Sequence, residues 1–594
     1  MTLEEKEMTL SSPALNTYHA RTDLGRYGDN GLLLFALQMG LAIEDIDTVA
    51  ALALTDGSDD KKCDLVYVDL VNGRAVLAQG YFSSKPRDSA PANKASDLNT
   101  AAAWLLGASE DQLPERLRPA RNELHEALRT AQIRRLEVWY VHNLPESKNV
   151  QDELDRAGAT ARALLKERFP DCSIEDVVAL EVGITTLDRW YATSQVPILV
   201  TDEIAVPGSP GFSESGDSWD AYCTSVPASW LTEMFSRYGT GLFSANVRDY
   251  LGSINSDANI NNNIKQTAEN APSRFFAYNN GLTILVNDLQ TPESNGAPLT
   301  IRGISIVNGA QTTGALANSK ATDVALGEAR VLTRFVKCAD QRVIREIIQY
   351  NNSQNKIEAA DFRSNDKIQE RLRQEFGLIP DAEYRGGRRG SEKDIIERRP
   401  NLIPTQTAAQ AIAAFHGQPN IAYNETRRIW SSDEVYSQIF PEFITARHAL
   451  FCFSLLKAIE EAKFDLTQIA SGQRTKVQTA QIDFLRKRGS TFLVTTAVSS
   501  CLETVLDRAI VDSWRLRFTP NLSAKDAVSQ WRPVLIPLLS FVDQLEDALT
   551  GYLKNNEKTN SSLTRFQRLV HATRNAIGTD AFAEFSAGVT DNAG

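Results

Sequence analysis

The chain lacks the groupings of cysteine and histidine that mark most small metal sites and disulfide frameworks. Its 594 residues include six cysteines and six histidines. No two cysteines form a C-x-x-C pair, and the histidines form neither H-x-H nor H-E-x-x-H. The cysteines stand far apart, at Cys63, Cys172, Cys223, Cys338, Cys452 and Cys501. This spacing fits neither a zinc ribbon nor the disulfide framework of a small secreted protein.

Long apolar segments are also missing. The longest uncharged apolar stretch, residues 31–43, is shorter than the roughly 20 residues that a helix needs to cross a bilayer. The first residues, MTLEEKEM, are acidic and lack the apolar core of a signal peptide. We therefore expect a cytoplasmic protein without a membrane partner.

Basic residues are outnumbered by acidic ones. The chain has 63 Lys and Arg against 75 Asp and Glu, which gives a net charge of −12. This balance excludes a coat that binds nucleic acid through its bulk charge, but it leaves room for a local basic groove. The 42% of hydrophobic and 23% of charged residues are ordinary for globular proteins and exclude wholesale disorder.

The length predicts three or four domains, and the local patterns predict an α/β multidomain protein with a helical end. Residues 1–20 carry no periodic pattern and are expected to form a loose arm. Residues 21–195 alternate helical and strand patterns, as an α/β domain does. Residues 196–225 are rich in Pro, Gly and Ser, which predicts a linker or long loop. Residues 226–420 predict a mixed α/β core, and residues 421–594 a helical domain that serves for homo-oligomer formation or partner docking.

Two strand patterns near the N-terminus are joined by a hairpin signal. Asn72-Gly73 separates two apolar runs, and Asn-Gly between such runs predicts a tight turn. Asp64 begins the first run and Gln79 lies on the second. Metal-dependent phosphodiesterases hold Mg²⁺ with an acidic residue on one strand and an acidic or amide residue on its neighbour, followed by a Lys two positions later. Asp64 and Gln79 are therefore candidate metal ligands and catalytic residues.

The Lys of this pattern is missing, because Tyr81 stands two positions after Gln79. An ammonium there would stabilise the negative charge that develops on the phosphate. Lys85 has the same strand parity as Gln79 and replaces that ammonium if the strand continues. Spacing alone is equally consistent with an ordinary hairpin whose first strand begins at Asp64.

Three amide-rich clusters lie in the central region, NNGLT from Asn279, NGAQT from Asn308 and NNSQN from Asn351. Their structural interpretation is a set of turns, since Asn and Gly tolerate positive φ. NNGLT in particular has the pattern of a hairpin between two apolar runs, and NGAQT that of a strand, a glycine turn and a helix. Their functional interpretation is recognition of base edges or ribose hydroxyls by amides. The candidate ligand-binding amides are Asn279, Asn280, Asn308, Gln311, Asn351, Asn352, Gln354 and Asn355.

A basic patch follows these clusters, in the sequence YRGGRRG. Arginines beside glycines suit close approach to a phosphate backbone, and they suit a solvated loop equally well. Arg385, Arg388 and Arg389 are therefore candidate phosphate contacts.

These clusters, in this order, resemble the AIPR family, the abortive infection phage resistance proteins of bacteria. The similar stretches are LFSANVRDYLG, FFAYNNGLTI, ISIVNGAQT, IIQYNNSQNKIEAADF and LIPTQTAAQAIAAF, within roughly residues 226–416. The resemblance implies anti-phage defence, often beside helicases, DNA methyltransferases and other nucleases. It also implies an N-terminal restriction-endonuclease-like domain, from whose pattern this chain departs at Tyr81 and at Leu65, where a Gly is usual.

Residues and resemblance together predict a defence protein that binds or senses DNA or RNA through a degenerate nuclease-like domain and an amide-rich core. Other defence-system proteins are expected partners. The alternative is an active nuclease effector with Mg²⁺ as its cofactor, built on Asp64, Gln79 and Lys85. A nucleotide-responsive switch around Asn308 is a third hypothesis.

Overall fold

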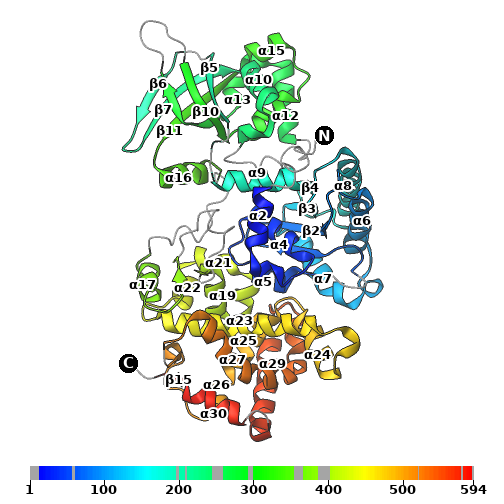
Figure 1. Ribbon diagram of the computed structural model, residues 1–594, viewed down its shortest axis with the longest axis vertical. Coiled ribbons are helices and arrows are strands. Elements are labelled where there is room, and N and C mark those ends of the chain that lie inside the picture. Colours follow the sequence, from blue (N-terminus) through cyan, green and yellow to red (C-terminus); the bar gives the residue numbers. More distant parts are fainter. Residues whose placement is uncertain are drawn as a thin grey trace.

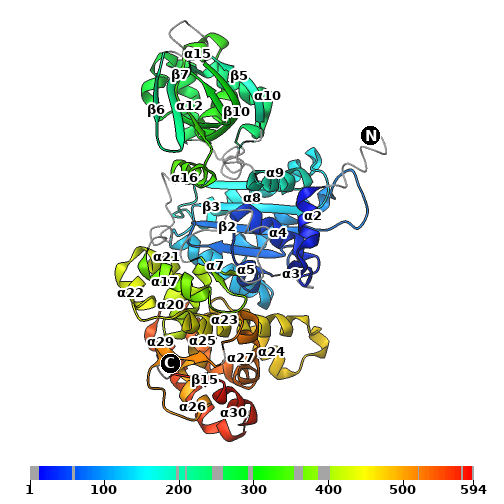
Figure 2. The same ribbon diagram turned by 60° about the vertical axis from the view of Figure 1, so that its left-hand side comes forward.

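The computed structural model describes residues 12–55, 60–195, 198, 200–207, 210–243, 259–291, 299–352, 366–385, 402–519, 521–576 and 579–591. Three bodies follow one another along the long axis of the molecule (Figure 1). The N-terminal domain lies in the middle, between a domain with a seven-stranded sheet and a helical domain, and a view turned by 60° shows the same order (Figure 2). The order in space therefore differs from the order along the chain.

The N-terminal domain is built on a four-stranded sheet with the strand order β1-β2-β3-β4. β1 is antiparallel to β2, while β2, β3 and β4 are parallel. The strands are β1 (Leu65–Asp69), β2 (Arg74–Tyr81), β3 (Arg135–His142) and β4 (Asp176–Val182). The helices are α2 (Pro13–Ala20), α3 (Thr22–Gly25), α4 (Asn30–Leu41), α5 (Ile46–Ala53), α6 (Ala92–Ala102), α7 (Arg118–Arg129), α8 (Lys148–Arg168) and α9 (Ile184–Gln195). The mixed α/β architecture predicted for this region is confirmed.

Each face of this sheet has its own hydrophobic core. α4 and α9 pack with Val76, Ala78 and Trp139 on one face. α6, α7 and α8 pack with Val66, Leu77 and other side chains on the opposite face. The alternation of side chains along β2 thus directs even-numbered residues toward α4 and odd-numbered residues, Gln79 and Tyr81 among them, toward α6.

The hairpin predicted at Asn72-Gly73 is confirmed. β1 and β2 pair from Asp69 opposite Arg74, and Gly73 has a φ of +64°. The Asp69 carboxylate accepts hydrogen bonds from the backbone N–H and side-chain amide of Asn72, at 2.9 and 2.8 Å. This local bonding fixes the register that sets Asp64 against Gln79.

The apolar helix predicted near residues 30–43 is α4, which is buried from Asn30 to Gly40. A Cβ added at Gly40 would lie 2.6 Å from Trp139 and 2.9 Å from Trp190. We expect Gly40→Ala to lower the free energy of unfolding by about 1–3 kcal/mol, because neither indole can move without disturbing the core. Gly327→Ala is the control, since its Cβ meets nothing within 4 Å and it lies in a helix. Urea denaturation should show that variant unchanged or stabilised by up to about 1 kcal/mol.

The second domain contains a seven-stranded sheet with the order β5-β10-β8-β11-β7-β6, and β9 also pairs with β10. The strands are β5 (Val200–Val206), β6 (Phe212–Ser215), β7 (Trp219–Pro227), β8 (Leu282–Val286), β9 (Asp288–Gln290), β10 (Leu299–Asn308) and β11 (Arg330–Cys338). The helices are α10 (Ala228–Tyr238), α12 (Asn259–Asn270), α13 (Phe275–Tyr278), α14 (Ala310–Ala317), α15 (Asp323–Glu328) and α16 (Gln341–Asn352). α10 and α14 pack on one face of the sheet, and α16 packs on the other.

The linker predicted at residues 196–225 is wrong for the described part of that range. β5, β6 and most of β7 lie there, and all three belong to the sheet. In β5, Ile204 and Val206 are buried while their neighbours are exposed. The Pro, Gly and Ser that suggested a linker lie mainly in short turns and on exposed edge-strand positions, where they do not prevent strand pairing.

The third domain is helical, as predicted, but its core begins well before residue 421. A single hydrophobic cluster runs from Leu372 to Val589 and includes Phe376 and Phe415. The predicted boundary at 420 therefore does not separate two cores, because α17 and α19 both pack on α23. The helices are α17 (Lys367–Phe376), α19 (Thr405–Phe415), α20 (Pro419–Asn424), α21 (Thr426–Ser431), α22 (Asp433–Ile439), α23 (Ala446–Gln468), α24 (Lys476–Leu485), α25 (Ser490–Ser500), α26 (Leu502–Leu506), α27 (Ala524–Leu538), α28 (Glu546–Leu549), α29 (Asn556–Thr573) and α30 (Thr579–Ala587). Two short strand pairs, β12 (Glu383–Tyr384) with β13 (Leu402–Ile403) and β14 (Arg517–Phe518) with β15 (Val589–Thr590), complete it.

The predicted N-terminal arm is wrong for residues 12–20, which form α2 and its cap, and residues 1–11 lie outside the described residues. Ser12 caps the helix by accepting the N–H of Leu15, and Pro13 follows at the first helical position. The Ser12 hydroxyl also donates to Asp188 at 2.6 Å, which fixes α2 to α9. The cap and the proline were the available sequence signal for this short helix.

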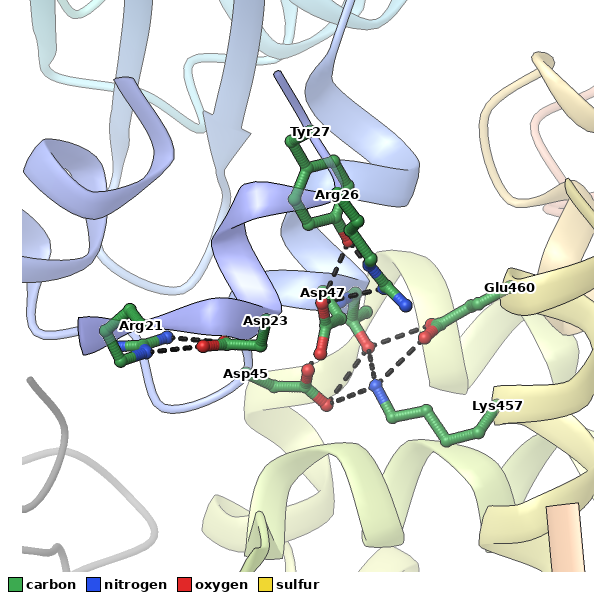
Figure 3. A network of polar contacts seen from close by, with 9 residues as sticks. Arg21, Asp23, Arg26, Tyr27, Asp45, Asp47, Lys457 and Glu460 are labelled. Carbon is green, nitrogen blue, oxygen red and sulfur yellow. Dashed lines mark hydrogen bonds and ion pairs between the residues drawn. The ribbon is translucent and has the colours of Figure 1, made fainter. Parts of the chain in front are cut away.

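Buried ion pairs fix the N-terminal domain to the helical domain. Figure 3 shows Lys457 of α23 between Glu460 and Asp45, at 2.9 and 2.6 Å. Thr48 donates to Glu460 at 2.8 Å, and Thr407 of α19 donates to Asp45 at 2.9 Å. These contacts join α5 and its cap to α19 and α23, which lie far away in the sequence.

Among the described residues, none of the helices combines the length and the apolarity that a bilayer crossing requires.

Candidate nucleic-acid interface

Asp64 and Gln79 lie opposite each other across the β1–β2 hairpin. The pairing of Leu65 with Ala78 places Asp64 one residue before and Gln79 one residue after that pair. The backbone N–H of Asp64 donates to the carbonyl of Ala78 at 2.9 Å, which holds Asp64 against β2 just before β1 begins. Directly opposed residues of antiparallel strands are close neighbours. The structure therefore brings together the two residues that the sequence pattern singles out.

The two side chains offer oxygen atoms to a cation. Asp64 Oδ2 accepts the backbone N–H of Gly80 at 2.7 Å. Gln79 is 4% exposed, and its buried Oε1 has no hydrogen-bond partner among the residues that the structure describes. A buried oxygen without a partner is unfavourable, and an ion or ligand is one way to satisfy it. Mg²⁺ is commonly held by one or two protein oxygens while its other ligands are waters and phosphate, so this pair fits it.

The ammonium required for phosphodiester cleavage is not on β2. The strand ends at Tyr81, and exposed Lys85 lies four residues beyond that end. The turn there is held by Asn143, which accepts the N–H of Ser83 and donates to its carbonyl, both at 2.8 Å. Tyr81 packs, partly buried, against the core on the α6 face. An aromatic ring therefore occupies the position two residues after Gln79.

A row of polar side chains extends from this pair across the sheet. Gln79 pairs with Tyr140 of β3, and Tyr140 pairs with Glu181 of β4. Glu181 lies 3.0 Å from Nε2 of the fully buried His142 and accepts the N–H of Ser147 at 3.2 Å. Polar residues near the C-terminal ends of the predicted strands were the available signal for Tyr140 and Glu181, which the sequence analysis did not select.

Tyr140 stays protonated in this row. Burial raises its pKa above the ordinary value, and the nearby groups Tyr81, Glu181 and Asp97 raise it further. Its hydroxyl is 3.4 Å from the carbonyl of Pro91, to which it donates. Tyr140 can therefore donate a hydrogen bond but does not act as a base.

Lysines that the sequence analysis did not select border this row. Lys62 and Lys94 both approach Oδ2 of Asp97, at 3.7 and 3.9 Å, and their side chains are 52% and 39% exposed. The Lys61 ammonium lies 4.9 Å from the centre of the Trp104 ring. Lys62 and Lys94 thus gather around Asp97 of α6, the helix that packs on the face of the sheet that carries the row. A phosphate at the row would meet cations that come from its flanks rather than from β2.

Two of the amide clusters meet at one end of the seven-stranded sheet. The Asn279 amide donates to Thr312 at 3.1 Å, and its carbonyl oxygen accepts the N–H of Gly281 at 2.9 Å. Asn308 ends β10, Gly309 has a φ of +106°, and α14 follows, so the strand–turn–helix prediction is confirmed. Asn280 and Gln311 are exposed beside this contact.

The hairpin interpretation of NNGLT is wrong. Phe275–Tyr278 is the short helix α13, so Asn279 to Gly281 connect a helix to β8 rather than two strands. A close approach sets this turn, since a Cβ on Gly281 would lie 2.6 Å from the Leu332 carbonyl. Apolar periodicity over four residues cannot distinguish a helical turn from a strand.

The remaining predicted residues do not join this contact. Asn351 donates to the carbonyl of Ile347 in its own helix at 2.8 Å, and Asn352 is the last residue of α16. Arg385 follows β12 in the helical domain, where it lies 3.6 Å from Glu383. Gln354, Asn355, Arg388 and Arg389 lie outside the described residues.

The helical domain holds a titratable cluster that was not among the predicted site residues. His416, His448 and Cys452 have ligand atoms within 4.8 Å of one another. The spacing of four residues between His448 and Cys452 on one helix was the available sequence signal.

Residues 243–522 match the family model described as AIPR protein. Neither a curated protein nor a solved structure matches the chain. The match begins in the domain with the seven-stranded sheet and continues through α26 of the helical domain, so it extends past the predicted limit near residue 420. This agrees with the hydrophobic core that α17 and α19 share with α23. The chain therefore carries an AIPR family domain at residues 243–522.

Proposed function

We propose that this protein acts in anti-phage defence of the abortive-infection type and binds nucleic acid without cutting it. The AIPR domain at residues 243–522 supports the defence role. In the binding role, Lys62 and Lys94 contact phosphates at the surface beside the buried row from Asp64 to Glu181. The exposed amides of Asn280 and Gln311 supply base or ribose contacts in the second domain.

The observation that carries binding rather than cleavage is the end of β2 at Tyr81. Cleavage needs a positive group that stabilises charge on the phosphate as the nucleophile attacks. Tyr81 is packed against the α6 face, and Lys85 lies outside the strand. The same surface still offers positive charge to a phosphate backbone, which is sufficient for binding.

Mg²⁺-dependent cleavage is the second candidate, and the buried Gln79 Oε1 beside Asp64 favours it. Mg²⁺ held there would polarise a phosphate oxygen and lower the pKa of a bound water. In this version Asp64 and Gln79 position the ion, and Lys62 or Lys94 supplies the positive charge that β2 lacks.

Nucleic-acid binding is tested with the double variant Lys62→Ala/Lys94→Ala. We expect weaker binding of DNA or RNA, and a slope of log affinity against log salt that is reduced by about 1 for each lysine. Fluorescence anisotropy over a series of salt concentrations measures both. Lys166→Ala is the control, because this exposed residue lies in the last turn of α8, at the opposite end of the parallel strands. Unchanged binding by the double variant, or no binding by the wild type at low salt, contradicts the proposed interface.

The same preparations separate binding from cleavage. With Mg²⁺ or Mn²⁺ present, we expect labelled DNA and RNA to stay intact. If the wild type cleaves and both Asp64→Ala and Gln79→Ala do not, binding without cleavage is contradicted and Mg²⁺-dependent cleavage is supported. The defence role is tested separately, by phage plating on cells that do or do not express the protein, and equal plating for every phage tried contradicts it.

A further inference from the structure

Three metal-binding side chains converge inside the helical domain, far from the polar row of the N-terminal domain. Nε2 of His416 lies 2.9 Å from Nε2 of His448, and Sγ of Cys452 lies 3.4 Å from the same nitrogen. His416 follows α19, while His448 and Cys452 stand one turn apart on α23. Residues four apart share a face of a helix, so both α23 side chains point toward α19.

The hydrogen bond of Nδ1 fixes the tautomer of His448. Nδ1 lies 2.9 Å from the carbonyl oxygen of Leu516, which can only accept a hydrogen bond. Nδ1 therefore carries the proton, and the lone pair of Nε2 points at His416 and Cys452. Histidines that bind metals are commonly held in this way, by a carbonyl or carboxylate on the second nitrogen.

Hydrogen bonds among His416, His448 and Cys452 cannot satisfy all three side chains. The single lone pair of His448 Nε2 can accept one good hydrogen bond, yet both the His416 imidazole and the Cys452 thiol face it. His448 and Cys452 are fully buried, so water cannot supply the hydrogen-bond partner that is missing here. A cation at the centre would satisfy all three atoms at once.

The surroundings hold the imidazoles in position. Trp514 stacks on His416 with ring centres 3.5 Å apart and an angle of 10° between the planes. The Phe415 ring meets the His448 ring edge-on at 5.7 Å. Such packing reduces the entropy lost when a metal fixes its ligands.

We propose that His416, His448 and Cys452 bind one Zn²⁺ ion through Nε2, Nε2 and Sγ, with a fourth position open to water. Zinc takes imidazole and thiolate ligands in tetrahedral geometry, at about 2.0–2.1 and 2.3 Å. Those bond lengths place two nitrogens about 3.4 Å apart and a nitrogen and a sulfur about 3.6 Å apart. The present separations of 2.9 and 3.4 Å thus need to widen by half an ångström or less. The open position lies toward His416, the one of the three residues that is partly exposed.

The protonation states of the two imidazoles agree with such a site. Burial lowers the pKa of His416 to about 2, with a contribution from His448, and lowers the pKa of His448 to about 4. Both rings are therefore neutral near pH 7, as metal ligands must be. Burial raises the pKa of the Cys452 thiol well above its ordinary value. Zinc then displaces the thiol proton to solvent as the Zn–S bond forms, so zinc affinity should fall as the pH is lowered.

The ion would join three segments of the helical domain. It ties α19 to α23, and through the Leu516 carbonyl and the Trp514 stack it orders the chain before β14. All of these residues lie within the AIPR match at residues 243–522. Zinc would thus stabilise the helical part of that domain and leave one coordination position for an external ligand.

Metal analysis of the full-length protein, purified without chelators, tests the proposal. We expect about one zinc per chain in the wild type and a loss of it in Cys452→Ser and His416→Ala. Cys501→Ser and His571→Ala are the matched controls, because Cys501 lies between α25 and α26 and His571 on α29 of the same domain, and both should keep the ion. Zinc that persists in Cys452→Ser and His416→Ala overturns the proposal.

A second measurement does not depend on the folding of the variants. Addition of Co²⁺ to metal-free wild-type protein should produce the intense visible bands of tetrahedral cobalt and a thiolate charge-transfer band in the near ultraviolet. Zinc should then displace both. Wild-type protein that contains no zinc and develops no such spectrum overturns the proposal.

Discussion

Replacing Lys457 by Ala should lower the free energy of unfolding by about 3–5 kcal/mol, because it leaves two buried carboxylates without their counter-charge. The Lys457 side chain is 14% exposed, and those of Asp45 and Glu460 are 7% and 6% exposed. Burial alone would lower the pKa of Lys457, but the charges of Asp45 and Glu460 outweigh it and hold the pKa above its ordinary value. Urea denaturation measures the loss, and hydrogen exchange should show weaker protection in α5 and α23, which form this contact (Figure 3).

Lys554→Ala is the matched control for Lys457. Lys554 pairs with Glu126 at 3.0 Å and also joins the N-terminal and helical domains, but these side chains are 40% and 30% exposed. Water screens an exposed pair, so we expect a change within about 1 kcal/mol. If the two variants lose equal stability, burial of the Lys457 pair is not what holds the domains together.

Lys463 should make the stability of the protein rise with pH above neutrality. The pKa of Lys463 is lowered from 10.5 to about 7, mainly by burial and also by the charges of Arg488 and Arg486, while Glu460 acts in the opposite direction. Below about pH 7 both the folded and the unfolded state carry the proton, so the full cost of burying the charge is present. Between about pH 7 and 10.5 the unfolded state binds more protons than the folded state, and stability therefore increases with pH. Above both pKa values Lys463 is neutral in the folded and the unfolded state, so folding no longer buries a charge there.

The change is measured against Lys463→Met, which fills the same space without a charge. The wild type should gain up to about 4–5 kcal/mol relative to this variant as the pH rises through the window, since one pKa unit corresponds to 1.36 kcal/mol. At pH 7 the variant should be the more stable of the two. Exposed Lys476→Met is the control, and its stability relative to the wild type should not vary with pH in this range. If the free energies of unfolding of the wild type and Lys463→Met change with pH in parallel, the buried ammonium keeps an ordinary pKa.

Features that depend on a few neighbouring residues were predictable from the sequence. Asn72-Gly73 formed the expected hairpin, residues near 30–43 formed a buried helix, and Asn308-Gly309 joined a strand to a helix. Each rests on a turn residue or an apolar run whose preference is local. The placement of Asp64 and Gln79 beside the Leu65–Ala78 pair followed from the same hairpin, because the turn sets the register.

Composition was a poor guide where tertiary contacts decide the outcome. The Pro, Gly and Ser of residues 196–225 suggested a linker, yet β5 and β7 pair there with strands from much later in the chain. α17 and α19 were assigned to the central core, yet their apolar faces pack on α23. A local pattern indicates that a face is apolar but does not identify the segment that will cover it.

The sequence by itself determined the buried helix near residues 30–43, the hairpin at Asn72-Gly73 and the resemblance of the central region to the AIPR family. Only the tertiary structure decided which chemical groups meet. Lys457 reaches Asp45 across 412 positions, and His416 reaches His448 across 32. Turns and helix faces arise from preferences of neighbouring residues, which the sequence displays directly. The meeting of distant side chains depends on how whole domains pack, and in this protein that packing places the first domain of the chain between the other two (Figure 2).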